Sequence, residues 1–203
     1  MTRINKGRPY PLGSSITSAG VNFSLIATNA EYVEILLFEK EDSISPKYIF
    51  KLDQNNNTGP YWHAEIKNIK EGCIYAFRIK QKNNEINKNY EKKVLLDPCS
   101  RGITGWANYK RENALKTHEN TNTCLKSVVC ERKSFNFKDY PRPKHSWEET
   151  IIYELHIKAF TESTEGDESC CKKFLKKIPY LKELGITTIE LLPIFCFDPT
   201  DAP

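Results

Sequence analysis

The chain has 203 residues, and 39% of them are hydrophobic, which suffices for one large or two small domains with a core. Thirty basic and 26 acidic residues give a formal net charge of +4, and the lysines are scattered, so the sequence lacks the clustered basic footprint of a nucleic-acid-binding protein. No apolar run reaches membrane-spanning length, and the N-terminus lacks the apolar stretch of a secretion signal. We therefore expect a cytoplasmic protein with neither nucleic acid nor membrane as a partner.

The seven cysteines show no pattern of metal ligation. Their number is odd, no CxxC pair occurs, and no other spacing fits a metal site. We expect free thiols, as in a reducing compartment, and no metal or other cofactor. The cysteines are Cys73, Cys99, Cys124, Cys130, Cys170, Cys171 and Cys196.

The first half of the chain alternates apolar and polar residues with a period of two. The runs are "GVNFSLIA" at 20–27, "EYVEILLFE" at 31–39, "YWHAEIKNI" at 61–69 and "CIYAFRIK" at 73–80. Short strands separated by turn-rich segments indicate an antiparallel β-sandwich. We expect the inward residues to include Val21, Phe23, Val33, Ile35, Tyr75 and Phe77. "KVLLDP" and "LKSVVCE" are candidates for further edge strands.

Two polar segments follow this strand-rich region. Residues 100–123 show no clear period and are predicted to form a surface loop. The stretch "FKDYPRPKHSW" is punctuated by prolines, which favour an extended path. We place the sandwich at 1–112, a linker at 113–146 and a second domain at 147–203.

The pattern after Trp147 predicts a strand, a helix and a second strand. The first strand spans 150–157, and "ITTIELLPI" forms the second. Between them Gly185 ends a helix that Asp167 or Ser169 starts. Its apolar positions are Phe174, Leu175, Ile178, Leu181 and Leu184, and Pro179 predicts a kink. This order indicates one right-handed βαβ unit.

Four stretches, in order along the chain, carry a resemblance to one family. "GRPYPLGSSITSAGVNFSLIATNAEYVEILLF" and "KVLLDPCSRGITG" are similar to the start and the end of the N-terminal module of isoamylase-type glycogen debranching enzymes, which belong to glycoside hydrolase family 13 in the α-amylase superfamily. "WEETIIYELHIKAFT" resembles the first strand of their catalytic barrel. "IPYLKELGITTIELLPIFCFD" resembles the helix and strand that follow.

The resemblance implies a family 48 carbohydrate-binding module, which is an immunoglobulin-like sandwich, followed by the start of a (β/α)₈ barrel. It also implies hydrolysis of α-1,6 branches in glycogen or starch without a cofactor, so that an α-glucan is the expected partner. Retaining hydrolysis needs two carboxylates about 5 Å apart. The family carries them on later barrel strands, whereas this sequence supplies two of eight strands, so no catalytic residue is assigned and the substrate-binding residues stay unknown. The loop "ESTEGDESCCKKFL" is shorter than its counterpart in the family.

Three polar residues after Trp147 suggest a catalytic group at first sight. Glu154 and His156 share a face of the first strand, and Glu190 lies on the second. They could form a polar layer inside a barrel, and a histidine between carboxylates could transfer protons. Structural pairing is the alternative that we favour.

The three tryptophans and a group of lysines are further candidates for binding. Trp62 is predicted to pack in the core, Trp106 could be exposed in a loop, and Trp147 is predicted to pack against the first barrel strand. The helix lysines form a solvated face, with a partner site as the alternative; they are Lys172, Lys173, Lys176 and Lys177.

These observations leave three hypotheses for the function. The chain is the N-terminal fragment of a debranching enzyme, a non-catalytic α-glucan-binding module, or an inert remnant of an interrupted gene. We expect residues 1–203 alone to be inactive, because only Asp198 and Asp201 lie near the end of a barrel strand and neither has an evident partner.

Overall fold

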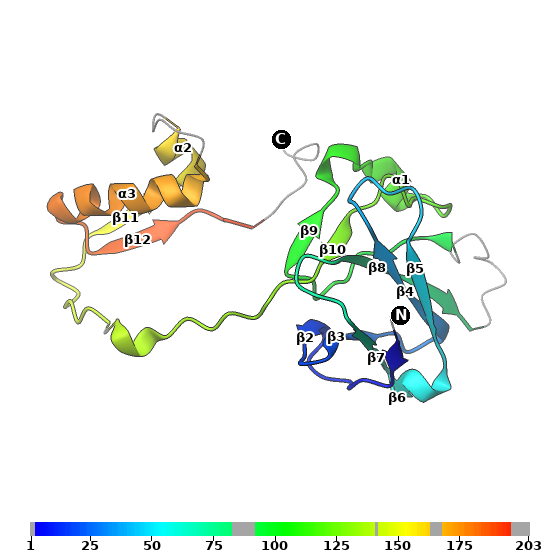
Figure 1. The fold of residues 1–203 in the computed structure, drawn as a ribbon. Helices are drawn as coiled ribbons and strands as arrows, with labels where there is room; N and C mark the ends of the chain where they lie inside the picture. Colours follow the sequence, from blue (N-terminus) through cyan, green and yellow to red (C-terminus); the bar gives the residue numbers. More distant parts are fainter. Residues whose placement is uncertain (1–2, 83–91, 141, 163–167, 196–203) are drawn as a thin grey trace. The chain divides into compact units, whose positions relative to one another are not determined.

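The computed structural model divides the chain into two compact units, Met1–Ser134 and Phe135–Pro203, which are described separately (Figure 1). The structure describes residues 3–82, 92–140, 142–162 and 168–195. Because Asp167, Cys196, Asp198 and Asp201 lie outside these ranges, the predictions that involve them stay untested.

The first unit consists of two antiparallel sheets. The first sheet has the strand order β1-β7-β3-β2 with β6 beside β7, and the second has the order β5-β4-β8-β10-β9. The strands of the first sheet are β1 (Ile4–Asn5), β2 (Gly13–Ile16), β3 (Gly20–Ile26), β6 (Asn57–Thr58) and β7 (Tyr61–Lys67). Those of the second are β4 (Ala30–Phe38), β5 (Tyr48–Leu52), β8 (Ile74–Gln81), β9 (Gly102–Thr104) and β10 (Lys126–Val128). The short helices of this unit are η1 (Gln54–Asn56), η3 (Trp106–Asn108) and α1 (Arg111–Leu115).

The core lies between the two sheets, as the period-two pattern predicted. Alternate side chains of β3 and β7 pack against alternate side chains of β4 and β8 in one buried cluster. The six residues predicted to face inward are all buried: Val21, Phe23, Val33, Ile35, Tyr75 and Phe77. The sandwich prediction is therefore confirmed.

The outer face of the first sheet is covered by the N-terminal segment. Although Asn22 and Ser24 alternate with the core residues of β3, both are buried. Asn22 accepts a hydrogen bond from the backbone N–H of Arg8 at 2.8 Å and donates to its carbonyl at 3.0 Å. Gly7, with φ +69°, permits this approach, since a Cβ there would lie 2.5 Å from Asn22 Oδ1. The buried polar side chains of β3 therefore form hydrogen bonds with the backbone of the N-terminal segment instead of with water.

The outer face of the second sheet is covered by the segment between β8 and β10. Leu36 and Ala76 on this face form a buried cluster with Val94 and Cys124 from that segment. Both faces of β4 are consequently buried, which explains why its sequence contains the continuous apolar run Ile35–Phe38.

This covering segment corrects two sequence predictions. Residues 100–123 are not a surface loop throughout, because Asn120 and Thr121 are buried. The predicted linker 113–146 contains β10, which pairs with β8 and β9, so the first compact unit extends to Ser134. "LKSVVCE" supplies β10, but this strand lies between β8 and β9 rather than at the predicted edge of the sheet. "KVLLDP" contributes a single bridge between Phe77 and Leu95.

A buried hydrogen bond joins β8 to the segment after it. The Tyr75 hydroxyl donates to Asp97 Oδ2 at 2.6 Å, and the backbone N–H of Cys99 donates to Oδ1 at 2.8 Å. Burial raises the pKa of the Asp97 carboxyl, and the two donors oppose that rise. Burial also raises the pKa of the Tyr75 phenol, so Tyr75 is the donor at neutral pH.

The second unit contains a parallel strand pair joined by helices. Its elements are η4 (Phe137–Asp139), β11 (Ile152–Leu155), α2 (Ile157–Thr161), α3 (Cys170–Glu183) and β12 (Thr188–Leu191). Phe174 and Leu181 of α3 pack with Leu155 and Ile157 in one buried cluster. The strand, helix, strand order agrees with the sequence prediction in this unit.

Several details of the second unit differ from the prediction. The first strand spans 152–155 rather than 150–157, because α2 begins immediately after it. Leu175 and Leu184 are exposed although they share the helical spacing of the buried positions. Ser169 occupies the N-cap of α3 without a side-chain hydrogen bond. Gly185 follows the helix at φ +88°, as predicted for its end.

The Tyr75–Asp97 hydrogen bond gives a stability prediction. Tyr75→Phe removes a donor and leaves a buried carboxylate with one partner fewer, at a cost of about 1–3 kcal/mol in unfolding free energy near pH 7. Because the folded state raises the Asp97 pKa, the folded protein binds a proton more tightly than the unfolded chain. The penalty therefore shrinks as the pH falls and Asp97 becomes protonated. Urea denaturation at several pH values measures it.

The matched control for this experiment is Tyr48→Phe, because Tyr48 is exposed on β5. That variant should lose less than about 0.5 kcal/mol. A Tyr75→Phe penalty that stays constant or grows with falling pH contradicts the assignment of the carboxylate as the group left unpaired.

Candidate functional site

The polar residues singled out in the second unit are only partly brought together. Glu154 and Glu190 are register partners on parallel β11 and β12, so they face the same side, as predicted, and both are exposed. His156 does not join them on the strand. It occupies the N-cap of α2, and its Nδ1 accepts a hydrogen bond from the backbone N–H of Ala159 at 3.2 Å. The predicted layer of three residues is therefore wrong, and the histidine has a capping role.

The structure confirms the prediction for one tryptophan and contradicts that for another. Trp62 lies in the core, and its indole N–H donates to the Ala27 carbonyl at 3.0 Å. Trp106 is half-buried and packs edge-on against Tyr109, with ring centroids 5.8 Å apart. Trp147 is 87% exposed, so the prediction that it packs against the first barrel strand is wrong.

A cleft of about 380 Å³ lies on the first unit where the covering segment meets the β4–β5 turn. We call it the amide cleft. Three short stretches supply its lining: Asp42 and Ile44 from the turn, Ala107, Asn108, Tyr109 and Lys110 after η3, and Asn122 and Thr123 before β10. The volume is that of a site for one or two sugar rings or another small molecule.

Lys126 of β10 holds two walls of the amide cleft in place. Its side chain is buried, and the ammonium donates to the carbonyl of Glu41 at 2.8 Å and to that of Thr121 at 2.9 Å. The same ammonium lies 5.0 Å from the centre of the Phe38 ring. Each carbonyl lies one residue from the cleft lining, so this one cation fixes the turn relative to the segment before β10.

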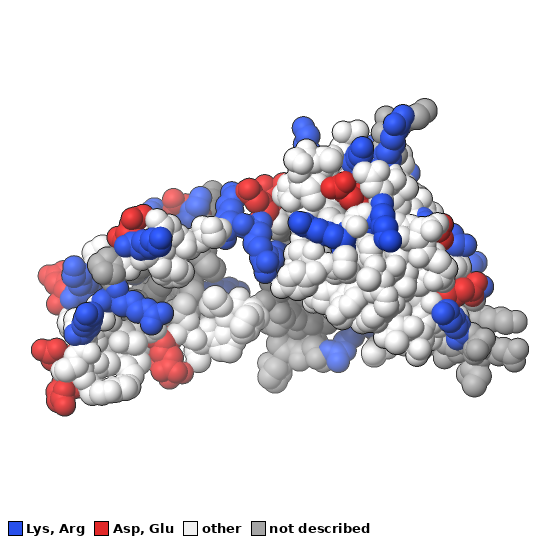
Figure 2. Space-filling model, turned by 90° about the horizontal axis from the view of Figure 1, so that it is seen from below, with Lys and Arg blue, Asp and Glu red and all other residues white. Residues whose placement is uncertain are grey.

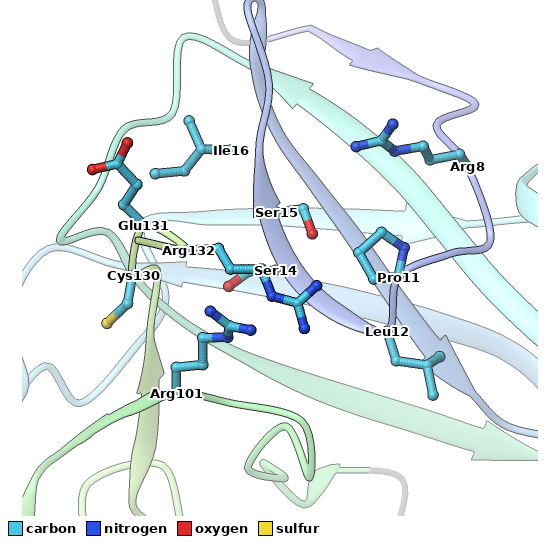
Figure 3. Close-up of a pocket in the computed structure, with 10 residues that line it drawn as sticks. All are labelled: Arg8, Pro11, Leu12, Ser14, Ser15, Ile16, Arg101, Cys130, Glu131 and Arg132. Carbon is cyan, nitrogen blue, oxygen red and sulfur yellow. The ribbon is translucent and has the colours of Figure 1, made fainter. Parts of the chain in front are cut away.

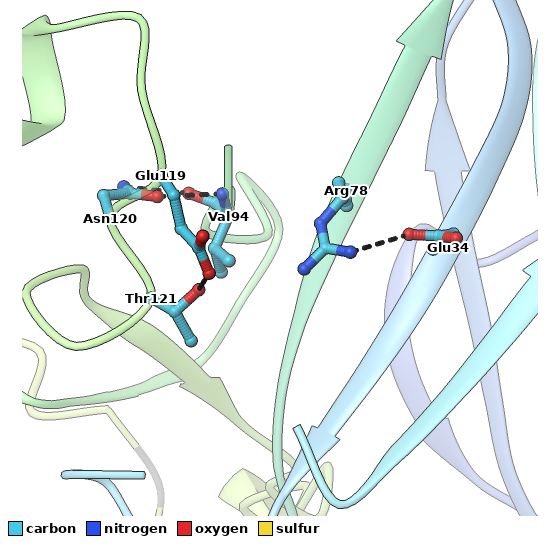
Figure 4. A network of polar contacts seen from close by, with 6 residues as sticks. All are labelled: Glu34, Arg78, Val94, Glu119, Asn120 and Thr121. Carbon is cyan, nitrogen blue, oxygen red and sulfur yellow. Dashed lines mark hydrogen bonds and ion pairs between the residues drawn. The ribbon is translucent and has the colours of Figure 1, made fainter. Parts of the chain in front are cut away.

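Further polar side chains fix the rest of the covering segment (Figure 4). Asn120 accepts from the backbone N–H of Val94 at 2.9 Å and donates to its carbonyl at 3.2 Å. The ammonium of Lys93 donates to the carbonyls of Asn113, Ala114 and Lys116 at the end of α1, and burial lowers the pKa of Lys93. The backbone N–H of Lys110 donates to the Thr123 carbonyl at 3.1 Å, which joins the lining stretch after η3 to the stretch before β10.

The chemistry of the amide cleft suits hydroxyl-rich ligands. The side chains of Asp42, Asn108 and Asn122 make no hydrogen bond to the rest of the described chain. A carboxylate and two amides together accept and donate, as neighbouring sugar hydroxyls require. Tyr109 adds a ring that can pack on a sugar face and a hydroxyl that can bond to it.

The sequence pattern does not reveal these cleft residues. It predicts only a turn at Asp42 and Ile44, and a surface loop that includes residues 107–110 and 122–123. One signal was available in the segment "GWANYK", where Trp106 and Tyr109 are three residues apart with amide residues nearby. The contact between this loop and the β4–β5 turn depends on tertiary structure.

On the face displayed in Figure 2, basic and acidic side chains are interspersed with uncharged surface. Within the described residues no group of three or more His, Cys, Asp or Glu side chains could hold a metal ion. Six described cysteines are free thiols, and Cys196 lies outside the described residues. None of the described helices is both long and apolar enough to cross a bilayer.

The first unit is a β-sandwich, and part of it matches a family of carbohydrate-binding modules. Residues 11–100 match carbohydrate-binding module 48, the isoamylase N-terminal domain. This stretch contains most of the two sheets and the β4–β5 wall of the amide cleft.

The similarity to curated proteins extends over almost the whole chain. A glycogen debranching enzyme of Erwinia tasmaniensis is 31% identical over 211 aligned positions, which cover 97% of this chain and 31% of the relative. A glycogen debranching enzyme of Pectobacterium atrosepticum is 28% identical over 208 positions, covering 96% of this chain and 30% of the relative. The chain is therefore similar to glycogen debranching enzymes over almost its whole length. It spans about a third of the length of these relatives.

Solved structures share the fold. The catalytic module of the glycogen-degrading pneumococcal virulence factor SpuA, in complex with an inhibitor, superposes with a TM-score of 0.67 and 18% identity. The match covers 95% of this chain and 28% of that one. The pullulanase SAP of Group B Streptococcus, in complex with maltotetraose, gives a TM-score of 0.66 and 20% identity over 92% of this chain and 24% of that one.

The role assigned to Lys126 gives a second prediction. Lys126→Met keeps most of the side-chain volume but removes the ammonium that donates to the carbonyls of Glu41 and Thr121. We expect a loss of about 2–4 kcal/mol in unfolding free energy and faster amide hydrogen exchange in residues 105–124. Lys70→Met, at an exposed position, is the control and should change neither quantity. Unchanged exchange in residues 105–124 of the Lys126 variant would mean that the ammonium does not hold the cleft walls.

Proposed function

We propose that this chain is the N-terminal portion of a glycoside hydrolase that removes α-1,6 branches from glycogen or starch, and that its sandwich binds α-glucan at the amide cleft. The match of residues 11–100 to carbohydrate-binding module 48 carries the proposal. The similarity to glycogen debranching enzymes supports the substrate class. No cofactor takes part, and the proposed location is the cytoplasm.

The arrangement of the second unit supports its interpretation as the opening of a (β/α)₈ barrel. β11 and β12 are parallel neighbours, with α3 between them in the chain. In such a barrel the side chains of Glu154 and Glu190 belong to one face of the sheet and the packed side of α3 to the other. The exposed apolar side chains of this unit are the surfaces that further strands and helices would cover; they include Ile152, Leu175, Leu184, Leu191, Leu192 and Phe195.

Two alternatives belong to other classes of function. A non-catalytic α-glucan-binding module would use the amide cleft in the same way but would take part in no hydrolysis. An inert remnant of an interrupted gene would bind no glucan. Binding and hydrolysis therefore have to be measured separately.

Glycogen binding tests the sandwich. We expect the purified chain to co-sediment with glycogen, and Tyr109→Ala to weaken the apparent affinity about tenfold, because a ring that packs on a sugar contributes on the order of 1–2 kcal/mol. Asn122→Ala should weaken binding several-fold, since it removes one amide from the lining. Affinity is read from depletion of the chain at increasing glycogen concentration.

Tyr48→Ala is the control for this measurement, because Tyr48 is exposed on β5 and does not line the cleft. Thermal denaturation shows whether each variant is folded. Equal binding by the Tyr109 and Tyr48 variants would place the glucan elsewhere on the chain. Absence of binding by the unsubstituted chain would favour the inert remnant.

Hydrolysis tests whether residues 1–203 act alone. Retaining hydrolysis requires a nucleophile and an acid/base carboxylate positioned about 5 Å apart on a rigid frame. Glu154 and Glu190 are register partners one residue before the ends of β11 and β12, but both are exposed, and neither is held by a hydrogen bond or ion pair within the described residues. We expect no release of reducing sugar from amylopectin above a heat-treated control.

If release of reducing sugar is observed, two variants identify the carboxylates that are responsible. If the release disappears in Asp198→Ala, the terminal carboxylate takes part, and residues 1–203 are catalytic contrary to the proposal. If it disappears in the Glu154→Gln, Glu190→Gln double variant, the exposed pair on β11 and β12 takes part instead, and the proposal is equally contradicted.

A further inference from the structure

A second cleft of about 380 Å³ lies beside β2, the edge strand of the first sheet (Figure 3). We call it the arginine cleft. It shares no lining residue with the amide cleft. Its lining comes from three separate stretches: Arg8, Pro11, Leu12, Ser14, Ser15 and Ile16; Arg101; and Cys130, Glu131 and Arg132.

Three guanidinium groups contribute to this one cleft. Figure 3 shows the ends of Arg101 and Arg132 near Ser14 in the middle of the cleft, with Arg8 on the opposite side. The carboxylate of Glu131 points away from these two guanidiniums in the same view. Three cations and one anion leave a net charge of two positive units around the cleft.

These guanidiniums have no protein partner in the described part of the chain. The ion pairs there involve other residues, and none of the three arginine side chains donates a hydrogen bond. Arginines that gather without carboxylates repel one another, and an anion placed between them removes that repulsion. The cleft thus offers donors and positive charge that no described residue uses.

The backbone that carries each arginine is fixed before any ligand arrives. The backbone of Arg8 makes two hydrogen bonds with the side chain of Asn22. Next to Arg132, the Glu131 N–H donates to the side chain of Glu71 at 3.0 Å. Next to Arg101, the Ser100 hydroxyl donates to the Gly102 carbonyl at 2.6 Å, at the start of β9. The conformational entropy that is lost when a ligand binds therefore comes mainly from ordering the arginine side chains.

We propose that the arginine cleft binds a phosphate group, either free phosphate or the phosphate of a small sugar ester. A phosphate monoester carries a charge of about −1.5 to −2 near pH 7 and three acceptor oxygens, which match the net charge of the cleft and the planar forks of Arg101 and Arg132. The hydroxyl of Ser15 is a further donor in the lining. Succinate also carries about two negative charges, but it divides them between two carboxylates of two oxygens each, so neither group satisfies as many of these donors as one phosphate does.

Isothermal titration calorimetry on the whole chain at fixed low ionic strength tests the proposal. The probes are inorganic phosphate, glucose 6-phosphate, succinate and glucose. Both phosphates should show saturable binding, succinate should bind at least about tenfold more weakly, and glucose should not bind. Similar affinity for the two phosphates identifies free phosphate as the ligand, whereas tighter binding of glucose 6-phosphate identifies a sugar ester. Absence of saturable phosphate binding, or succinate binding as tight as phosphate, overturns the proposal.

Variants assign the binding to this cleft. The Arg101→Gln, Arg132→Gln double variant should lose at least tenfold in phosphate affinity, because each charge-assisted hydrogen bond is stronger than a neutral one. Arg142→Gln, at an exposed position in the second unit, should bind phosphate as the unsubstituted chain does. Equal affinity in the double variant and in Arg142→Gln overturns the proposal.

A covalent probe supplies a readout that needs no arginine substitution. Cys130 lines the cleft, whereas Cys170 is exposed in α3 of the other unit. Iodoacetamide labelling followed by peptide mass spectrometry should show that glucose 6-phosphate slows modification of Cys130 at least threefold and leaves Cys170 unaffected. Equal effects on both thiols overturn the assignment to this cleft. Because the two clefts share no residue, this result is independent of glycogen binding.

Discussion

The hydrogen bonds from the buried ammonium of Lys126 to two backbone carbonyls fix the outer layer of the sandwich. They connect the β4–β5 turn, through Glu41, to the segment before β10, through Thr121. Lys93 and Asn120 act in the same way on neighbouring parts of that segment. A buried cation is stable only when its donors are satisfied, so these contacts specify one position for a stretch with little regular structure.

Both sheets are covered on their outer faces by irregular chain that polar side chains hold through its backbone. On the first sheet, Asn22 and Ser24 hold the segment at Arg8 and Pro9. On the second sheet, the lysines and Asn120 hold residues 93–124. The two clefts form at the margins of these covering segments, where loops meet strand ends. Binding residues on such loops are positioned by a rigid scaffold beneath them.

The second unit has a small core and a large exposed apolar surface. α3 covers one side of the parallel pair through Phe174 and Leu181, and the other side presents Glu154 and Glu190. Parallel sheets are normally covered on both faces and extended by further strands. The relatives, of which this chain spans about a third, are long enough to include such strands. The proposed debranching activity therefore depends on groups outside the described unit.

The sequence by itself determined the sandwich core and the side-by-side placement of Glu154 and Glu190, because a period of two in short runs assigns each side chain to a face. Four ordered stretches also indicated the similarity to glycogen debranching enzymes. Only the tertiary structure decided that residues 107–123 cover a sheet, that His156 caps a helix, and that both clefts exist. Those features depend on segments that are far apart in the chain but lie together in the fold, such as those of Arg8 and Arg132 around the arginine cleft and those of Glu41 and Lys126. Local periodicity carries no information about such contacts.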